Sequence, residues 1–94
     1  MTTLRIEHRV PDYEAWKQVF DGDPLDRKGS GVRRHSVYRR SDDPNVVAID
    51  LEFETTEQAE QMRAKLIELW AGMQGTIITE QQAYLAETVE TLEY

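Results

Sequence analysis

Strict alternation of hydrophobic and polar residues predicts strands in this chain. It covers residues 3–10, 46–54 and 83–93, and a period of two is typical of a strand because successive side chains point to opposite faces of a sheet. Residues 32–40 alternate less regularly and are predicted to form a further strand. The residues expected on the buried face of the first strand and of 46–54 are Leu4, Ile6, His8, Val10, Val47, Ile49, Leu51 and Phe53.

A stripe of aromatic residues predicts a helix over residues 11–21. Tyr13, Trp16 and Phe20 recur at spacings of three and four, which places them on one helix face. Pro11 and the acidic residues that follow it favour a helix start, because the first turn needs no proline N–H and attracts negative charge.

A second helix is predicted over residues 56–71. Thr55 followed by Gln58 is typical of a capping box. Residues 73–82, which follow this helix, carry no clear periodicity, and a short helix, a cleft lid or an interface loop all remain open for them. The apolar stripe of the helix comprises Ala59, Met62, Leu66, Leu69 and Trp70.

The order of these elements predicts one α+β domain of residues 1–94. The turn residues 42–45 join 32–40 to 46–54 as a hairpin, so the order is β, α, β, β, α, β. With right-handed crossovers, this order gives a four-stranded antiparallel sheet with both helices on one face. That is the ferredoxin-like arrangement, with strand order 4-1-3-2.

Composition narrows the functional classes. A net charge of −7 argues against nucleic-acid binding, which needs a dense positive surface. The chain has no cysteine, which excludes thiol catalysis and fits a reducing compartment. It has neither a signal-peptide pattern in its first residues nor an apolar run of roughly 20 residues, so we expect a cytoplasmic protein without membrane contact.

The charges at the two predicted sheet edges favour a homodimer. The second strand carries Arg33, Arg34, Arg39 and Arg40 around His35, and the last strand is expected to carry Glu87, Glu90 and Glu93. In a two-fold dimer the basic edge of one copy can lie beside the acidic edge of its mate and fix the register. The alternatives are that the edge charges only prevent aggregation, or that the arginine cluster binds a carboxylate or phosphate.

A resemblance to a known superfamily sharpens these expectations. The chain resembles small actinobacterial-type proteins of the dimeric α/β-barrel superfamily, which also includes antibiotic-biosynthesis monooxygenase-like domains, polyketide cyclases and haem-degrading enzymes. The likeness covers nearly the whole chain in topology, through motifs of low specificity. The residues that carry it are the run His8-Arg9-Val10-Pro11-Asp12-Tyr13-Glu14-Ala15-Trp16, the turn Asp43-Pro44-Asn45, and the strand Ile49–Phe53 before the capped helix.

The resemblance implies an obligate dimer with a ligand cleft between helices and sheet. The haem-degrading branch has an Asn on the first strand and a His ligand after the second helix; this chain has Trp70 at a fitting position but neither of those residues. The cofactor-free oxygenase branch surrounds an activated aromatic substrate with aromatic side chains, and no cofactor is expected. Candidate walls here are Tyr13, Trp16, Tyr38 and Trp70, although a tryptophan in a helical stripe more often belongs to the core.

His8 is the candidate catalytic residue. It lies in phase with the apolar face of the first strand, where a side chain that titrates near neutrality can accept a proton or orient a substrate. The plainer interpretation is a buried neutral histidine hydrogen-bonded to Asp12 or Tyr13. Two histidines without clustered acidic partners give no metal-ligand pattern. Asp50 and Glu52 share a strand face, and Arg5, Arg9 or Arg34 are expected to neutralise them.

Two functional hypotheses follow from these residues. The first is a homodimer that binds or transforms a small aromatic or polyketide-like molecule, in the manner of a cofactor-free monooxygenase or cyclase. The second is a non-catalytic homodimeric module whose core is filled. An open cleft that reaches His8 and several of the aromatic residues would favour the first hypothesis.

Overall fold

The computed structural model describes residues 1–73 and 78–94. Its four strands form one antiparallel sheet of order β2-β3-β1-β4, which confirms the predicted order 4-1-3-2 and the ferredoxin-like fold. Along the chain the elements are β1 (Thr2–Arg9), α1 (Tyr13–Asp21), β2 (Arg34–Arg39), β3 (Val46–Phe53), α2 (Thr56–Met73) and β4 (Thr79–Glu87).

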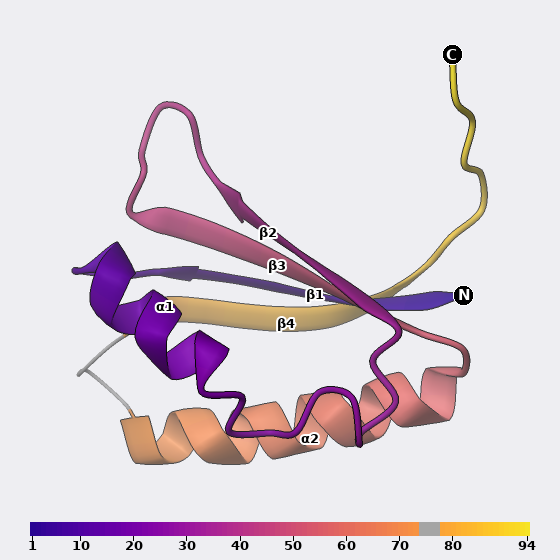
Figure 1. Ribbon diagram of the computed structural model, residues 1–94, viewed down its shortest axis with the longest axis horizontal. Helices are drawn as coiled ribbons and strands as arrows, with labels where there is room; N and C mark the ends of the chain where they lie inside the picture. The colour runs from indigo at the N-terminus through magenta and orange to yellow at the C-terminus, as the bar shows by residue number, and fades with distance from the viewer. Residues whose placement is uncertain (74–77) are drawn as a thin grey trace.

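Both helices cover the same face of the sheet. Figure 1 shows α1 and α2 beneath the strands, with the loop between α1 and β2 running along α2. Two contacts hold this loop there: Lys65 of α2 donates to the Ser30 hydroxyl at 2.9 Å, and Gly31 lies so close to the Gln58 amide that a Cβ would approach its Nε2 to 2.8 Å. Gly31 also has a φ of +99°, so glycine suits this position on both counts.

The predicted strand faces are the faces that the structure buries. β1 and β3 pair so that Leu4 faces Leu51 and Ile6 faces Ile49, and their side chains alternate between buried and half-buried positions. The alternation of hydrophobic and polar residues predicts the buried face of each strand correctly, because it runs through each strand without a break. The core is completed by Trp16 of α1, by Ile78 before β4, and by the α2 residues Ala59, Met62, Leu66 and Trp70.

Both helix starts follow from side-chain capping. Asp12 is extended and its carboxylate accepts the N–H groups of Glu14 and Ala15, so α1 begins at Tyr13 and not at residue 11. Thr55 accepts the N–H of Gln58 at 3.2 Å, as the capping pattern predicts. In each case the capping side chain accepts hydrogen bonds from backbone N–H groups that have no partner within the helix.

The last strand was predicted in the wrong place. β4 runs over Thr79–Glu87 and not over 83–93, because its length is set by the register with β1, in which Thr79 pairs with Arg9 and Glu87 with Thr2. Beyond Thr88, which donates to the Met1 carbonyl, the chain has no strand to pair with. β2 is likewise shorter than predicted. Of the unplaced residues 73–82, residues 74–77 lie outside the described residues.

The edge charges are mostly used within one chain. Of the three acidic residues predicted for the last strand, Glu87 lies in β4 and accepts hydrogen bonds from Thr2 and Thr56, whereas Glu90 and Glu93 lie beyond the strand. Arg33 pairs with Glu54, Arg34 with Glu52 and Arg40 with Asp42. As expected, Arg34 neutralises Glu52, while the Asp50 carboxylate accepts two hydrogen bonds from Arg5, at 2.6 and 2.7 Å. Several of these edge charges thus have partners within the chain, and charge matching between the edges of two copies stays a prediction.

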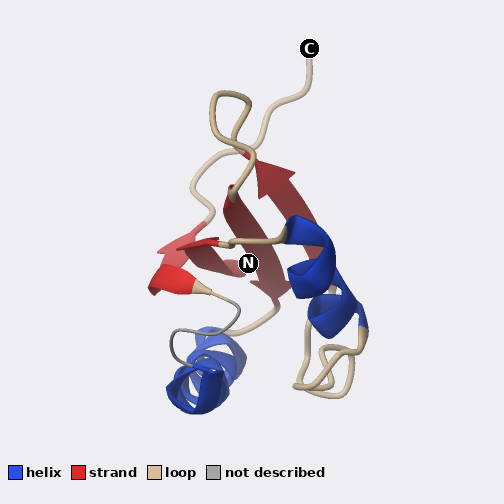
Figure 2. Ribbon diagram, turned by 90° about the vertical axis from the view of Figure 1, so that its left-hand side faces the viewer, coloured by secondary structure: helices blue, strands red, loops and turns tan. Residues whose placement is uncertain are grey.

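The face of the sheet away from the helices is open. Arg5, Tyr38, Asp50 and Tyr84 lie on it, because they pair across the strands in positions opposite in phase to the core residues. Figure 2 shows the two helices on one side of the strands and the C-terminal segment extending away from both. Among residues 1–73 and 78–94, no helix is long and apolar enough to span a membrane.

Candidate functional site

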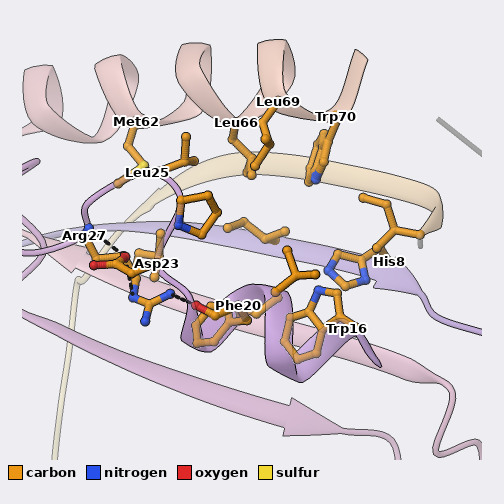
Figure 3. Close-up of a pocket in the computed structure, with 16 residues that line it drawn as sticks. His8, Trp16, Phe20, Asp23, Leu25, Arg27, Met62, Leu66, Leu69 and Trp70 are labelled. Carbon is orange, nitrogen blue, oxygen red and sulfur yellow. Dashed lines mark hydrogen bonds and ion pairs between the residues drawn. The ribbon is translucent and has the colours of Figure 1, made fainter. Parts of the chain in front are cut away.

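An apolar cavity lies between the sheet and the two helices. The volume in which the centre of a water molecule can move is about 80 Å³, several times the roughly 10–15 Å³ that one water needs. Figure 3 shows Met62, Leu66, Leu69 and Trp70 of α2 pointing into it from one side, with His8 and Trp16 at one end and Asp23 and Arg27 at the other.

His8 supplies the polar atom of this cavity. Its side chain points from β1 toward α1 and is only 4% exposed, and its Nδ1 has no hydrogen-bond partner among the described residues. Burial lowers the pKa of His8 from 6.5 to about 4, because removal from water disfavours the charged imidazolium. The imidazole is thus neutral near pH 7, and a buried nitrogen is left ready to bond to something else.

Helix α1 forms an aromatic wall beside His8. The His8 and Trp16 rings meet edge to face at a centroid distance of 5.3 Å, and Trp16 stacks on Phe20 at 5.2 Å. The spacing of four residues brings Trp16 and Phe20 onto one helix face, and the cap at Asp12 sets where that face begins.

The predicted site residues are brought together only in part. His8, Trp16 and Trp70 line the cavity. Tyr13 stands behind Trp16 at a ring distance of 5.8 Å, with the Arg39 guanidinium 4.0 Å from its own ring centre. Tyr38 is 49% exposed and lies on the open face of the sheet, so it is separated from the cavity by the sheet itself.

The plainer interpretation of His8 does not describe its surroundings. Asp12 bonds to the backbone of its own helix, and no hydrogen bond joins His8 to Asp12 or Tyr13 in the described part of the chain. The nearest ordered partner of the imidazole is the Trp16 ring, which packs against it without satisfying Nδ1.

Several lining residues escaped the sequence analysis. Leu25 sits in a loop that reads as polar, yet it packs against the core and lines the cavity; a lone leucine beside a proline in such a loop was the available signal. Ile78 is buried just before β4, in the segment without periodicity. Asp23 and Arg27 belong to the same loop as Leu25 and also line the cavity.

The loop that carries Leu25 and Arg27 is held by its own polar groups. The Asp23 carboxylate accepts the Arg27 backbone N–H at 2.9 Å, and Arg27 Nη1 donates to the Phe20 carbonyl at 2.8 Å. The Arg27 guanidinium lies 4.0 Å from the centre of the Phe20 ring, within range of a cation–π contact. These bonds close one end of the cavity. In the described ranges, no group of three acidic or histidine side chains is arranged to hold a metal ion.

Comparison with solved structures places the chain among proteins of one fold. SnoaB of Streptomyces nogalater, a cofactor-independent oxygenase, matches with a TM-score of 0.76 and 18% identity over 99% of this chain and 97% of its own. The Mycobacterium tuberculosis protein Rv0793 matches with a TM-score of 0.68 and 13% identity over 99% and 100%. A candidate antibiotic biosynthesis monooxygenase of Deinococcus radiodurans matches with a TM-score of 0.64 and 10% identity over 100% and 98%.

Comparison by sequence adds nothing to these matches. No protein-family model matches the chain, and no curated protein matches it. The identities to the solved structures are low enough that the likeness concerns the fold alone. The chain thus has the ferredoxin-like fold of the antibiotic-biosynthesis monooxygenase-like proteins, the group that its sequence resembles.

Proposed function

We propose that this protein binds a small aromatic molecule in the cavity beneath its sheet and oxidises it with molecular oxygen, without a cofactor. The observation that carries the proposal is an apolar cavity lined by His8, a buried residue whose Nδ1 has no hydrogen-bond partner among the described residues. Apolar walls with few placed polar groups are typical of small-molecule sites. A filled core, which the alternative of a non-catalytic module requires, does not match such a cavity.

His8 is proposed to orient the ligand. An unpartnered buried polar atom costs roughly 1–3 kcal/mol, and a ring hydroxyl on the ligand would recover this cost by hydrogen bonding to Nδ1. A pKa of about 4 makes His8 a weak base in the empty cavity. The side chain therefore suits hydrogen bonding to a hydroxyl better than full removal of its proton.

The size and lining of the cavity favour a flat, small ligand. A volume of about 80 Å³ is roughly half that of the ~150 Å³ apolar cavity that holds benzene, so a single ring would need a small outward shift of the walls, which include Trp16 and Trp70. A hydroxylated ring can supply all the electrons itself: a phenol and O2 give a quinone and water, with one oxygen atom inserted at a ring C–H bond and the other leaving as water. This oxidation therefore needs no bound metal or flavin. SnoaB, which shares the fold, is described as a cofactor-independent oxygenase, and this supports the oxidation step of the proposal.

A homodimer is part of the proposal. The open sheet face presents Tyr38 and Tyr84, each nearly half exposed, around the ion pair of Arg5 and Asp50. Aromatic and arginine side chains are enriched where proteins associate. A second copy on this face would cover the tyrosines and leave the cavity, on the opposite face, accessible in each copy.

Ligand binding can be followed directly by tryptophan fluorescence. Trp16 and Trp70, the two tryptophans of the chain, both line the cavity, so a ligand that enters it should change the emission. A panel of single-ring phenols and dihydroxybenzenes is to be titrated into the purified protein. We expect saturable binding by the ring compounds that carry a hydroxyl group and weaker binding by the matched methyl arenes.

A matched pair of variants locates the binding. Leu66→Phe adds bulk inside the cavity, and we expect at least a tenfold loss of affinity. Ile67→Phe makes the same kind of change one residue along on α2, at a side chain that is 45% exposed, and should bind like the wild type. Equal affinities in the two variants would place the ligand elsewhere.

Oxygen uptake tests the chemistry separately. An oxygen electrode should record consumption that depends on both protein and bound ring compound, in buffer with a chelator and without added flavin. We expect Leu66→Phe to lose this activity in step with its affinity. Saturable binding without oxygen uptake across the panel would contradict the oxidation step and leave a binding protein.

A further inference from the structure

A second hollow, which we call the basic cleft, adjoins the cavity. It is wider and open, with a volume of about 680 Å³, and lies between the loop after α1, the start of β2 and the first turn of α2. Its charged lining is predominantly positive in a chain of net charge −7. The charged side chains that line it are Asp23, Arg27, Lys28, Arg33, Arg34 and Glu54.

The cavity and the basic cleft meet at two residues. Asp23 and Arg27 line both, and Phe20 stands between them: its ring lines the cavity, while the His35 ring of the cleft packs against its edge at 5.3 Å. Figure 3 shows Asp23 and Arg27 at the end of the cavity remote from His8, with Phe20 between Arg27 and Trp16. The cavity and the basic cleft thus share Asp23 and Arg27 as a common wall at this end.

The cations at this junction retain hydrogen-bonding capacity. Arg27 uses Nη1 on the Phe20 carbonyl and Nε near the Asp23 carboxylate at 3.5 Å, which leaves Nη2 without a partner among the described residues. Lys28 forms no side-chain hydrogen bond or ion pair within residues 1–73 and 78–94, and it is exposed beside Arg27. A guanidinium with donors to spare next to an ammonium group is suited to an oxyanion.

Each hollow also holds one unsatisfied buried atom. In the described part of the chain, the buried side-chain polar atoms without a partner are His8 Nδ1 and Gln58 Oε1, and these two residues line the cavity and the cleft respectively. Rotating the Gln58 amide by 180° exchanges its oxygen with the NH₂ group, so this position can present a donor to an anion. Each of the two hollows is therefore lined by a residue that has one polar atom without a hydrogen-bond partner.

We propose that the aromatic ligand of the cavity carries a carboxylate, and that this group binds in the basic cleft to Arg27, Lys28 and Arg33. This inference rests on the proposed function and names its substrate class: a small arylalkanoic acid whose ring lies in the cavity near His8. Arg27, Arg33 and Arg34 are each paired with a carboxylate, so among the described residues Lys28 supplies the positive charge of the cleft that no carboxylate offsets. Such a patch concentrates anions that the rest of this acidic surface repels.

The test compares matched acids and alcohols. Benzoate, phenylacetate, 3-phenylpropionate and 4-phenylbutyrate are titrated beside the alcohols of equal length, with tryptophan fluorescence and calorimetry as readouts. The series is needed because the distance from ring to carboxylate decides which acid reaches both sites. We expect the best acid to bind at least tenfold more tightly than its alcohol at low salt, and this advantage to shrink at high salt because the attraction is screened.

Substitutions in the cleft should separate the two sites. Lys28→Gln and Arg33→Gln are each expected to weaken the acid three- to tenfold and to leave the alcohol unchanged. Arg40→Gln is the matched control, since Arg40 pairs with Asp42 at the far end of the β2–β3 hairpin. Arg27 is left in place in these variants because it also holds the loop.

The outcomes distinguish the inference from the proposed function. If acids and alcohols bind with equal affinity in the wild type, or if Arg40→Gln weakens the acid as much as Lys28→Gln does, the carboxylate site is wrong while the cavity proposal stands. If neither acids nor alcohols change the tryptophan emission or release heat, and single-ring phenols also fail, the cavity proposal falls and this inference with it. Selective loss of acid binding in the cleft variants supports the inference.

Discussion

His8 is a buried side chain whose unpartnered nitrogen is a cost to the fold. It lies on the core face of β1, 4% exposed, against the edge of Trp16. An aliphatic residue there would pack without an unsatisfied nitrogen, so the histidine is poorly explained by core packing. Binding of a ligand hydroxyl gives it a physical reason.

The lowered pKa of His8 makes the stability of the protein depend on pH. The unfolded chain takes up the proton near pH 6.5, whereas the folded protein resists it until about pH 4. The free energy of unfolding should therefore fall as the pH drops from 6.5 to 4, by about 3 kcal/mol at most, and change no further from this residue below pH 4. Urea denaturation at several pH values measures the effect.

His8→Leu is the control for this pH dependence. It removes the titrating group but keeps an apolar side chain at the position, so its stability should decline less steeply over the same pH range. The carboxylates titrate in both proteins, and the difference between the two curves isolates His8. Parallel curves would show that His8 is not held neutral by burial.

Helix α1, which carries the aromatic residues Trp16 and Phe20, is capped by a residue close in the sequence. Asp12 caps it by accepting the N–H groups of two residues in the first turn, at 3.0 and 3.3 Å. These hydrogen bonds join residues at most three positions apart in the sequence. A start of the helix near Pro11 and Asp12 could therefore be predicted from the sequence. The exact start at Tyr13 follows from the extended backbone of Asp12.

Loss of this cap should weaken the helix and the cavity wall together. We expect Asp12→Ala to lower the free energy of unfolding by about 1 kcal/mol. Asp12→Asn keeps an oxygen that can accept the same N–H groups and should stay within a few tenths of a kcal/mol of the wild type. Thermal and urea denaturation of the three proteins are the measurements, and equal losses in the two variants would assign the effect to charge and not to capping.

Elements that depend on distant partners were harder to predict. The alternation in residues 83–93 is real, but a strand exists only where another strand supplies hydrogen bonds, and β1 begins at Thr2. In β2, the adjacent residues Val37 and Tyr38 are both hydrophobic, so the sequence does not say which of them points to the core. The register with β3 decides it, because Val37 pairs with the core residue Ile49 and Tyr38 pairs with Ala48. Tyr38 therefore lies on the open face of the sheet.

At the scale of the whole molecule, the two faces of the sheet have different environments. One is covered by α1, α2 and the loop along α2 (Figure 1), and the other exposes Tyr38, Tyr84 and the pair of Arg5 with Asp50. The proposed dimer would use the second face, so that each copy keeps its own cavity and basic cleft. The C-terminal segment, which extends away from the body of the molecule, carries the exposed Val89, Leu92 and Tyr94.

A charge on the open face should disrupt the proposed dimer. Light scattering of the wild type is expected to give about twice the chain mass of 10.9 kDa. Tyr84→Glu should shift this mass toward that of one chain, because a two-fold interface brings two copies of each substitution into the same surface. Ala64→Glu places the same charge on the exposed side of α2 and should leave the mass unchanged. A wild-type mass of one chain would contradict the dimer.

The sequence by itself determined the type and order of the elements, the faces of β1 and β3, and the cap of α2. Each depends on residues within a few positions of one another, through the period of a strand or helix and through hydrogen bonds between near neighbours. It also placed His8, Trp16 and Trp70 on core-facing stripes, which is why they were candidates at all.

Only the tertiary structure decided that these stripes leave a cavity, that Leu25, Ile78 and Arg27 help to line it, and that Tyr38 does not. A cavity is the difference between the space enclosed by several elements and the volume of the side chains that fill it. That difference depends on how a loop, a helix and a strand far apart in sequence come to rest against each other, and no local pattern carries that information.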